Sequence, residues 1–152
     1  MPSRKRTVLI RFVSVLLVCL LIAPAPVFAT TTEIAQPYAS AYLTSYNTYI
    51  CPMGGGDLQI WFTVVGDTDM DYIGTMSIRL YESTDQSSWK LVKTFLHEDY
   101  SSMLAEDDYF HSSYVSYDGT AGKYYKAYVC IYAGIGNSGD TRYMWTSVKK
   151  AT

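Results

Sequence analysis

From Tyr38 onward, apolar residues recur at every second position, and turn-forming residues return about every dozen positions. A period of two is typical of strands with one buried face, because successive side chains of a strand point to opposite sides. The pattern predicts seven strands, over residues 39–50, 58–65, 73–81, 89–96, 109–117, 124–133 and 142–148. Only one helical turn is expected, at 100–104. The sequence therefore predicts an all-β, antiparallel fold.

Three of these strands have a clear apolar row that predicts the core. The rows hold Leu58, Ile60, Phe62 and Val64 in the second strand, Met76, Ile78 and Leu80 in the third, and Tyr125, Ala127, Val129, Ile131 and Ala133 in the sixth. The opposite face of the second strand is mixed and contains Trp61. Loops are expected at 66–71, at 97–108 and in the glycine-rich stretch 134–140, with a hairpin connection at 82–88.

Seven short strands without intervening helices favour two stacked antiparallel sheets, a β-sandwich. The segment 122–129 resembles the penultimate strand of immunoglobulin and fibronectin type III domains, in which a tyrosine hydrogen-bonds back at a corner. By this resemblance, Tyr124 or Tyr125 would be the corner tyrosine. The chain lacks the Cys…Trp…Cys core spacing of antibody domains, so a small Greek-key barrel or jelly roll stays open as the alternative.

The first 29 residues have the composition of a cleavable signal peptide. A basic start at residues 4–6 is followed by eleven uncharged residues at 12–22, two prolines, and a small-residue cleavage site ending at Ala29. The apolar stretch is short for a membrane-spanning helix. We therefore expect a secreted, extracellular protein, with residues 30–37 as a linker and 38–150 as a single domain.

Charge changes the set of expected partners once the leader is removed. The leader holds four of the twelve Lys and Arg and none of the fourteen Asp and Glu, so the remaining 123 residues, with eight basic and fourteen acidic side chains, have a net charge of −6. Such a chain offers little attraction to phosphate backbones or anionic lipids. Neither nucleic acid nor, after cleavage, a membrane is an expected partner.

Two cysteines remain after cleavage, Cys51 and Cys130. An oxidising exterior permits one disulfide between them, which would close a loop of about 80 residues and contribute roughly 4–5 kcal/mol in the chain-entropy model. The alternative is two separately buried thiols.

Acidic residues supply one metal hypothesis. Asp67, Asp69 and Asp71 alternate in the expected loop, a spacing that Ca²⁺ can use, although the positions of an EF-hand are not matched. The alternative is a solvated turn in which the aspartates cap backbone N–H groups. No other cofactor is expected.

Aromatic residues supply the binding hypothesis. The stretch 83–89 is similar to the Asp-box hairpin of sialidases, which is a structural turn, and it ends at Trp89. Tyr124, Tyr128 and Tyr132 share the face of their strand opposite the core row, together with Lys126. Trp89 and these tyrosines could stack on carbohydrate or meet a protein, or they could be ordinary sheet surface.

Four segments together are similar to a known family: 69–74, 78–85 ahead of Trp89, 123–129 and 139–143. They resemble small exported proteins with a domain of unknown function, found mainly in Gram-positive gut bacteria. The resemblance covers nearly the whole chain after the leader. It implies a secreted all-β domain and brings no activity, ligand or catalytic residue to this chain.

Catalytic motifs are missing from the sequence, which has no Gly-x-Ser-x-Gly elbow, no His-Glu-x-x-His and only two histidines, His97 and His111. We therefore expect a non-enzymatic module that binds a glycan or a protein at the extracellular surface. A structural, self-associating protein is the alternative, and the sequence leaves the oligomeric state open.

Overall fold

The computed structural model describes residues 40–152. The expected signal peptide, its cleavage site and the linker 30–37 lie outside these residues. The described chain forms strands β1 (Leu43–Gly54), β2 (Asp57–Ser83), β3 (Lys90–Leu96), β4 (Leu104–Asp118), β5 (Tyr124–Ile135), β6 (Ser138–Trp145) and β7 (Lys149–Lys150), with one 3₁₀ turn η1 (Ser101–Met103). The expected helical turn is present at η1.

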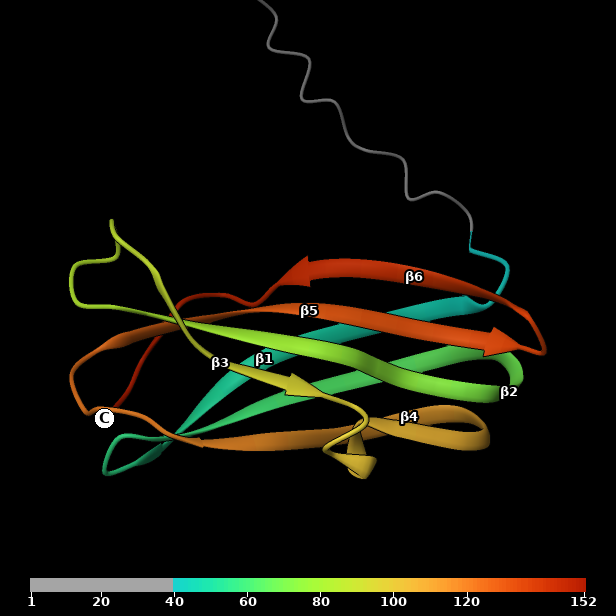
Figure 1. The fold of residues 1–152 in the computed structure, drawn as a ribbon, viewed down its shortest axis with the longest axis horizontal. Helices are drawn as coiled ribbons and strands as arrows, with labels where there is room; N and C mark the ends of the chain where they lie inside the picture. The colour runs from blue at the N-terminus through green and yellow to red at the C-terminus, as the bar shows by residue number, and fades with distance from the viewer. Residues whose placement is uncertain (1–39) are drawn as a thin grey trace, which may run out of the picture. The chain divides into compact units, whose positions relative to one another are not determined.

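Strand β2 runs through the whole sheet (Figure 1). One of its edges pairs with β1 over 57–66 and then with β5 over 72–83. Its other edge pairs with β4 over 57–74 and then with β3 over 77–82. Strand β5 in turn pairs with β6 and β7. All pairs are antiparallel, so the prediction of an all-β, antiparallel fold of about seven strands is confirmed.

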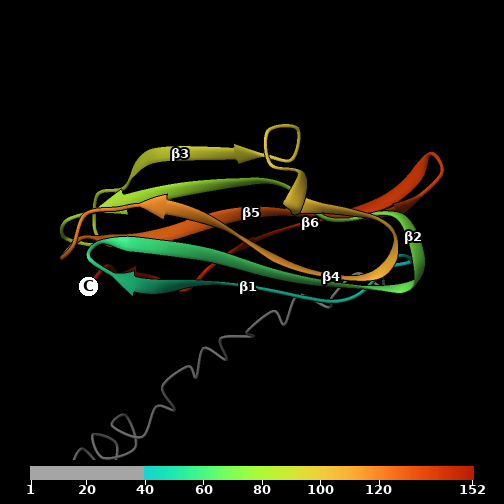
Figure 2. The same ribbon diagram turned by 90° about the horizontal axis from the view of Figure 1, so that it is seen from below.

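The two layers of the fold are halves of this one sheet, because β2 bends and belongs to both. The pairing of β2 with β4 jumps from Val65 to Met70, so residues 66–69 bulge out of the ladder. A Cβ on Gly66 would lie 2.9 Å from Cε of Met70, so glycine leaves room for the tight bend. Figure 2 shows β2 turning from one layer into the other. The expected loop at 66–71 is therefore wrong: the chain bends there within a single strand.

The core lies between the two halves. The rows expected in β2 and β5 are confirmed, since Leu58, Ile60, Phe62, Val64, Ile78, Leu80, Tyr125, Ala127, Val129, Ile131 and Ala133 are each no more than 1% exposed. Met76 is the exception. A register shift between Thr75 and Ser77 buries Thr75 in its place and leaves Met76 half-buried on the outer side.

Tyr125 makes the expected corner contact. Its hydroxyl accepts a hydrogen bond from the backbone N–H of Thr120 at 2.8 Å and donates one to the Glu82 carboxylate at 2.6 Å. Lys123 donates to the other oxygen of that carboxylate at 2.6 Å. Partial burial opposes ionisation of Glu82, but the bonds from Lys123 and Tyr125 outweigh it, so the pKa of Glu82 lies below its usual value.

The connection between β2 and β3 closes around Asp85, as expected for a hairpin built from side chains that bond to their own backbone. The Asp85 carboxylate accepts hydrogen bonds from the hydroxyl of Ser87 and from the N–H groups of Ser88 and Ser87, which hold its pKa well below the usual value. Ser83 accepts from the N–H of Gln86 at 2.8 Å. The hairpin therefore fixes the position of Trp89, directly before β3.

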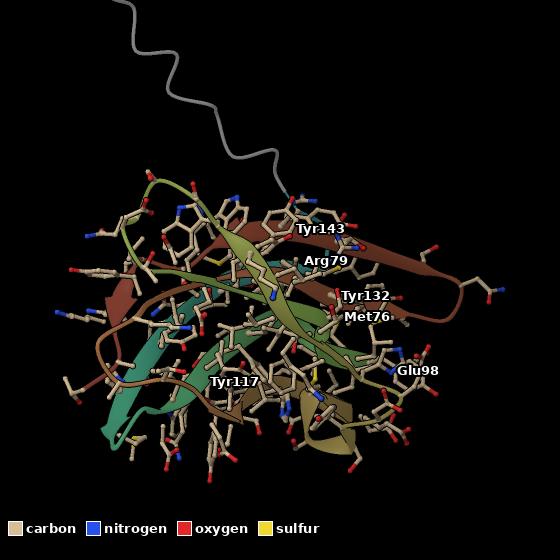
Figure 3. The ribbon with its side chains drawn as sticks, turned by 60° about the vertical axis from the view of Figure 1, so that its left-hand side comes forward. Met76, Arg79, Glu98, Tyr117, Tyr132 and Tyr143 are labelled. Atoms are coloured by element: carbon tan, nitrogen blue, oxygen red, sulfur yellow. The ribbon has the colours of Figure 1, made fainter. Side chains whose placement is uncertain are left out.

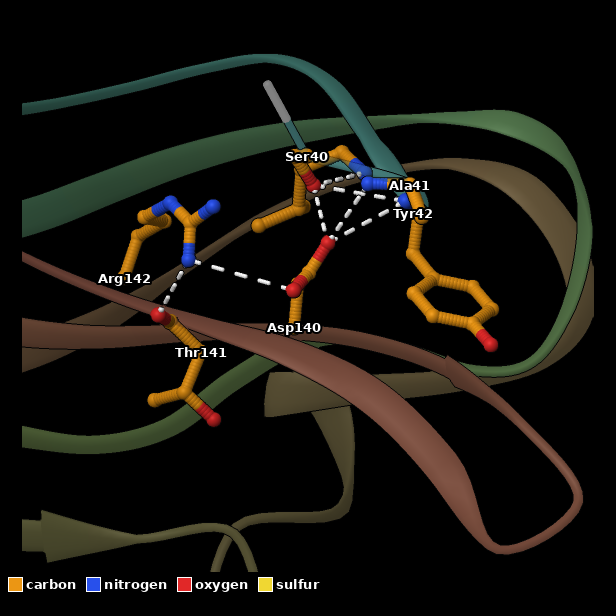
Figure 4. Close-up of polar contacts among 7 residues, drawn as sticks. Ser40, Ala41, Tyr42, Asp140, Thr141 and Arg142 are labelled. Atoms are coloured by element: carbon orange, nitrogen blue, oxygen red, sulfur yellow. Dashed lines mark hydrogen bonds and ion pairs between the residues drawn. The ribbon is translucent and has the colours of Figure 1, made fainter. Parts of the chain in front are cut away.

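The first described residues are held by the start of β6 (Figure 4). The Asp140 carboxylate accepts hydrogen bonds from the Ser40 hydroxyl and from the N–H groups of Ala41 and Tyr42, at 2.9 and 3.2 Å for the backbone donors. The bond from Ser40 leads the contacts that lower the pKa of Asp140. Arg142 lies 3.9 Å from the second carboxylate oxygen.

The corner predicts that Tyr125→Phe lowers the free energy of unfolding by about 1–3 kcal/mol, because the N–H of Thr120 loses its acceptor and the Glu82 carboxylate loses a donor. Tyr124→Phe, one residue earlier on the outer face, is the control and should change it by less than about 0.5 kcal/mol. Urea unfolding followed by tryptophan fluorescence measures both. Equal losses in the two variants would contradict the corner contact.

The lowered pKa of Glu82 predicts a contribution to stability that is present above the unfolded-state pKa of about 4.3 and is lost as the pH falls below it. The reason is that the unfolded chain takes up the proton first. The melting temperature of the wild type should fall more steeply between pH 5 and pH 3 than that of Glu82→Gln. Parallel curves for the two proteins would refute this assignment.

Candidate aromatic binding face

The strongest candidate site is the outer face of the second half of β2 together with β5 and β6. Alternation that buries Val129 and Ile131 turns Tyr128 and Cys130 outward. The pairing then places Arg79, Tyr128 and Trp145 side by side across the three strands. Tyr81 lies opposite Lys126, and Tyr143 lies opposite Cys130. We call Tyr81, Trp89, Tyr128, Tyr143 and Trp145 the aromatic strip.

The rings of the strip contact one another. The centroid of Tyr128 lies 5.6 Å from that of Tyr143, with the planes 13° apart, and 4.8 Å from that of Trp145. Tyr81 lies 5.3 Å from Trp145 on the other side. Tyr143 and Trp145 remain 60% and 48% exposed. The strip is therefore an ordered aromatic surface open to solvent.

Lys126 sits between the two indoles of the strip. Its ammonium nitrogen lies 4.2 Å from the ring centroid of Trp89 and 4.7 Å from that of Trp145, distances at which a cation is attracted to the ring face. The Trp89 indole N–H donates to the backbone oxygen of Gln86 at 3.1 Å. These contacts orient both indoles and leave one cation at this end of the strip.

The structure brings together part of the predicted binding set. Trp89 and Tyr128 belong to the strip, and Tyr124 shares its face, with the ammonium of Lys150 5.5 Å from its ring centroid. Tyr132 lies farther along the same face: in Figure 3, Tyr143, Arg79, Tyr132 and Met76 follow one another along one side of the molecule. The prediction missed Tyr81, Tyr143 and Trp145. Alternation in the last long strand, where Tyr143 and Trp145 flank an inward Met144, was the available signal.

A second aromatic row occupies the opposite outer face, formed by β1, the first half of β2 and β4. Tyr49, Trp61 and Tyr114 are paired side by side across these strands. The ring planes of Tyr49 and Trp61 are 3° apart, and their centroids are 6.3 Å apart. The ring centroid of Trp61 lies 4.6 Å from that of Tyr114. The sequence showed only that Trp61 faces away from the core. This row provides a matched control surface for the strip.

The three aspartates of the metal hypothesis lie at the bend of β2. Asp71 accepts a hydrogen bond from the N–H of Gly136 at 2.6 Å, and the N–H of Asp67 donates to the Tyr42 carbonyl oxygen at 3.2 Å. Within residues 40–152, no three His, Cys, Asp or Glu side chains are close enough together to hold a metal ion. The structure therefore does not bring Asp67, Asp69 and Asp71 together as the metal hypothesis required.

The disulfide between Cys51 and Cys130 is not formed, and both thiols are free. The physical reason is the alternation itself: each cysteine follows a buried residue, Ile50 or Val129, and so points outward from its own layer. The core separates the two side chains. Cys130 is only 9% exposed, and burial raises the pKa of its thiol.

Within the described residues, no helix is long and apolar enough to cross a membrane. No protein-family model matches the chain. No curated protein and no solved structure matches it either.

The positions of the thiols predict unequal reactivity towards Ellman's reagent. Half-buried Cys51 should react first. Cys130 should react at about one tenth of the rate of Cys51 or more slowly still, because burial disfavours its thiolate. Tyr143→Phe should slow Cys130 further, because the hydrogen bond from the Tyr143 hydroxyl lowers the pKa of that thiol and partly offsets the effect of burial. A mass two hydrogens lower in the unreduced protein would instead reveal the bridge.

Proposed function

We propose that this chain is a secreted, non-enzymatic binding module that engages an extracellular glycan through the aromatic strip. The observation that carries the proposal is the exposure of Tyr143 and Trp145, 60% and 48%, within a cluster of touching rings. Aromatic rings that stay exposed to solvent do not gain the favourable free energy of burial. Contiguous exposed apolar patches therefore mark interaction sites. Secretion rests on the predicted signal peptide.

Carbohydrate suits the strip for chemical reasons. The C–H faces of a sugar ring can stack on Tyr143, Tyr128 and Trp145, while its hydroxyl groups hydrogen-bond to the tyrosine hydroxyls and to the cations Lys126 and Arg79 at the same face. Because the rings are held by each other and by Lys126, little side-chain entropy would be lost on binding. A protein partner is the other outcome that the test below separates.

The proposal predicts that a glycan identified on an array binds about tenfold or more weakly to Tyr143→Ala and to Trp145→Ala. Tyr114→Ala is the matched control, since it removes an aromatic ring that is 41% exposed on the opposite face. Fluorescence titration measures the affinities. An array without hits across host and bacterial glycans, or equal losses in the control, would count against glycan binding by the strip.

Self-association is the alternative function, and one observation favours it. Among the described strands, β6 pairs only with β5, so its outer edge has backbone groups open to another chain. Light scattering at several protein concentrations separates the two functions. A monomer at all concentrations would exclude self-association, whereas a concentration-dependent dimer lost in an edge variant such as Thr141→Pro would favour it.

A further inference from the structure

A pocket of about 600 Å³ opens on the same outer face as the strip, beyond Tyr143. Tyr72, Tyr132, Met76 and Leu104 contribute apolar surface, and His97 and Glu106 are among its polar members. Tyr132 is four residues from Tyr128 on β5, a separation of roughly 13 Å along a strand. Pocket and strip therefore form one continuous surface that a short oligosaccharide could span.

The ring of Tyr132 lies flat on the sheet because two glycines leave room for it. Gly134 and Gly139 face each other in the β5–β6 pair. A Cβ on Gly139 would lie 2.6 Å from the Tyr132 hydroxyl oxygen and 2.8 Å from Cε2, and a Cβ on Gly134 would lie 2.3 Å from the same hydroxyl oxygen. Since Tyr132 also lines the pocket, one ring face rests on backbone and the other is available as a platform.

The wall of the pocket is the connection from β3 to η1, and it is firmly anchored. The N–H of His97 donates to the Met76 carbonyl oxygen at 3.2 Å, and the Tyr100 ring packs edge-on against Phe95 at 5.2 Å. Met103 is fully buried below this connection. A ligand would thus find the wall already in place.

The charges at the pocket limit the class of ligand. Glu106 is its only carboxylate and His97 its only basic group, and the exposed Glu98 lies beside His97, with 3.8 Å between the nearest nitrogen and oxygen atoms. Carboxylates repel anions and accept hydrogen bonds from hydroxyl groups. A neutral, hydroxylated ring fits this combination of one platform, apolar walls and a carboxylate better than a phosphate or an acidic sugar.

We propose that the pocket takes one neutral sugar of a glycan chain, stacked on Tyr132 and hydrogen-bonded to Glu106, while the neighbouring sugars lie on the aromatic strip. The inference rests on the proposed glycan-binding function and adds the class of sugar that the pocket takes.

The test uses methyl glycosides of neutral hexoses and N-acetylhexosamines as probes, with binding followed by saturation-transfer NMR. At least one should bind the wild type, and its affinity should fall about tenfold or more in Tyr132→Ala and Gly139→Ala. Gly139→Ala keeps the ring but displaces it, since the three atoms nearest to the added Cβ all belong to Tyr132. Glu106→Gln should also weaken binding, and Trp145→Ala should not.

The outcomes separate this inference from the proposed function. If no methyl glycoside binds, or if binding survives both Tyr132→Ala and Gly139→Ala, the pocket inference is refuted even where Trp145→Ala still weakens oligosaccharide binding. Binding of tetramethylammonium in place of the glycosides would refute it as well, because the pocket would then be a cation cage. If pocket variants abolish glycoside binding while Tyr143→Ala and Trp145→Ala leave oligosaccharide binding unchanged, the pocket stands and the strip fails.

Discussion

The bend of β2 at residues 66–69 determines where the other features lie. Because this one strand belongs to both layers, its bend turns the apolar rows of the two halves towards each other and leaves their other sides facing solvent. The same strand carries β4 and then β3 along one edge. The connection between those two strands must therefore pass the edge where they meet, and it becomes the wall of the pocket. The candidate site follows from the topology of a single strand.

The tyrosines show how one residue type serves both structure and surface. Among the tyrosines of residues 40–152, only Tyr125 is fully buried, and its hydroxyl has both an N–H donor and a carboxylate acceptor. A buried hydroxyl without such partners would cost free energy, so burial at this position depends on Thr120 and Glu82. Tyr143, on the outer face, has no such requirement and stays open. The strand period decides which of these two environments each tyrosine occupies.

Local patterns predicted what depends on local spacing: the all-β class, most of the core rows of β2 and β5, and the hairpin around Asp85. The corner tyrosine came from a resemblance, which left Tyr124 and Tyr125 open. They failed where distant segments meet. Tyr143 joins Tyr128 only through the β5–β6 register, and the pocket needs residues from β2, β4, β5 and the 97–101 connection. The sequence left the disulfide open, although Cys130 has the parity opposite to the core row that the same pattern identified, which argued against the bridge. The loop expected at 66–71 failed because a bend within a strand has the composition of a turn.

Gly139 shows that shape and strand stability compete at the pocket. Glycine weakens a strand, by roughly 0.5–1 kcal/mol relative to alanine, so each one in a strand needs a physical reason. Gly74 has such a reason in its backbone, with a φ of 147° and the Met103 carbonyl oxygen 2.2 Å from where a Cβ would be. Gly139 has no positive φ, and the three atoms nearest to an added Cβ all belong to the Tyr132 ring. A larger residue there would strengthen β6 and tilt the ring off the sheet. Packing of the core does not require glycine at position 139. The orientation of the Tyr132 ring explains why a residue that weakens the strand is found there.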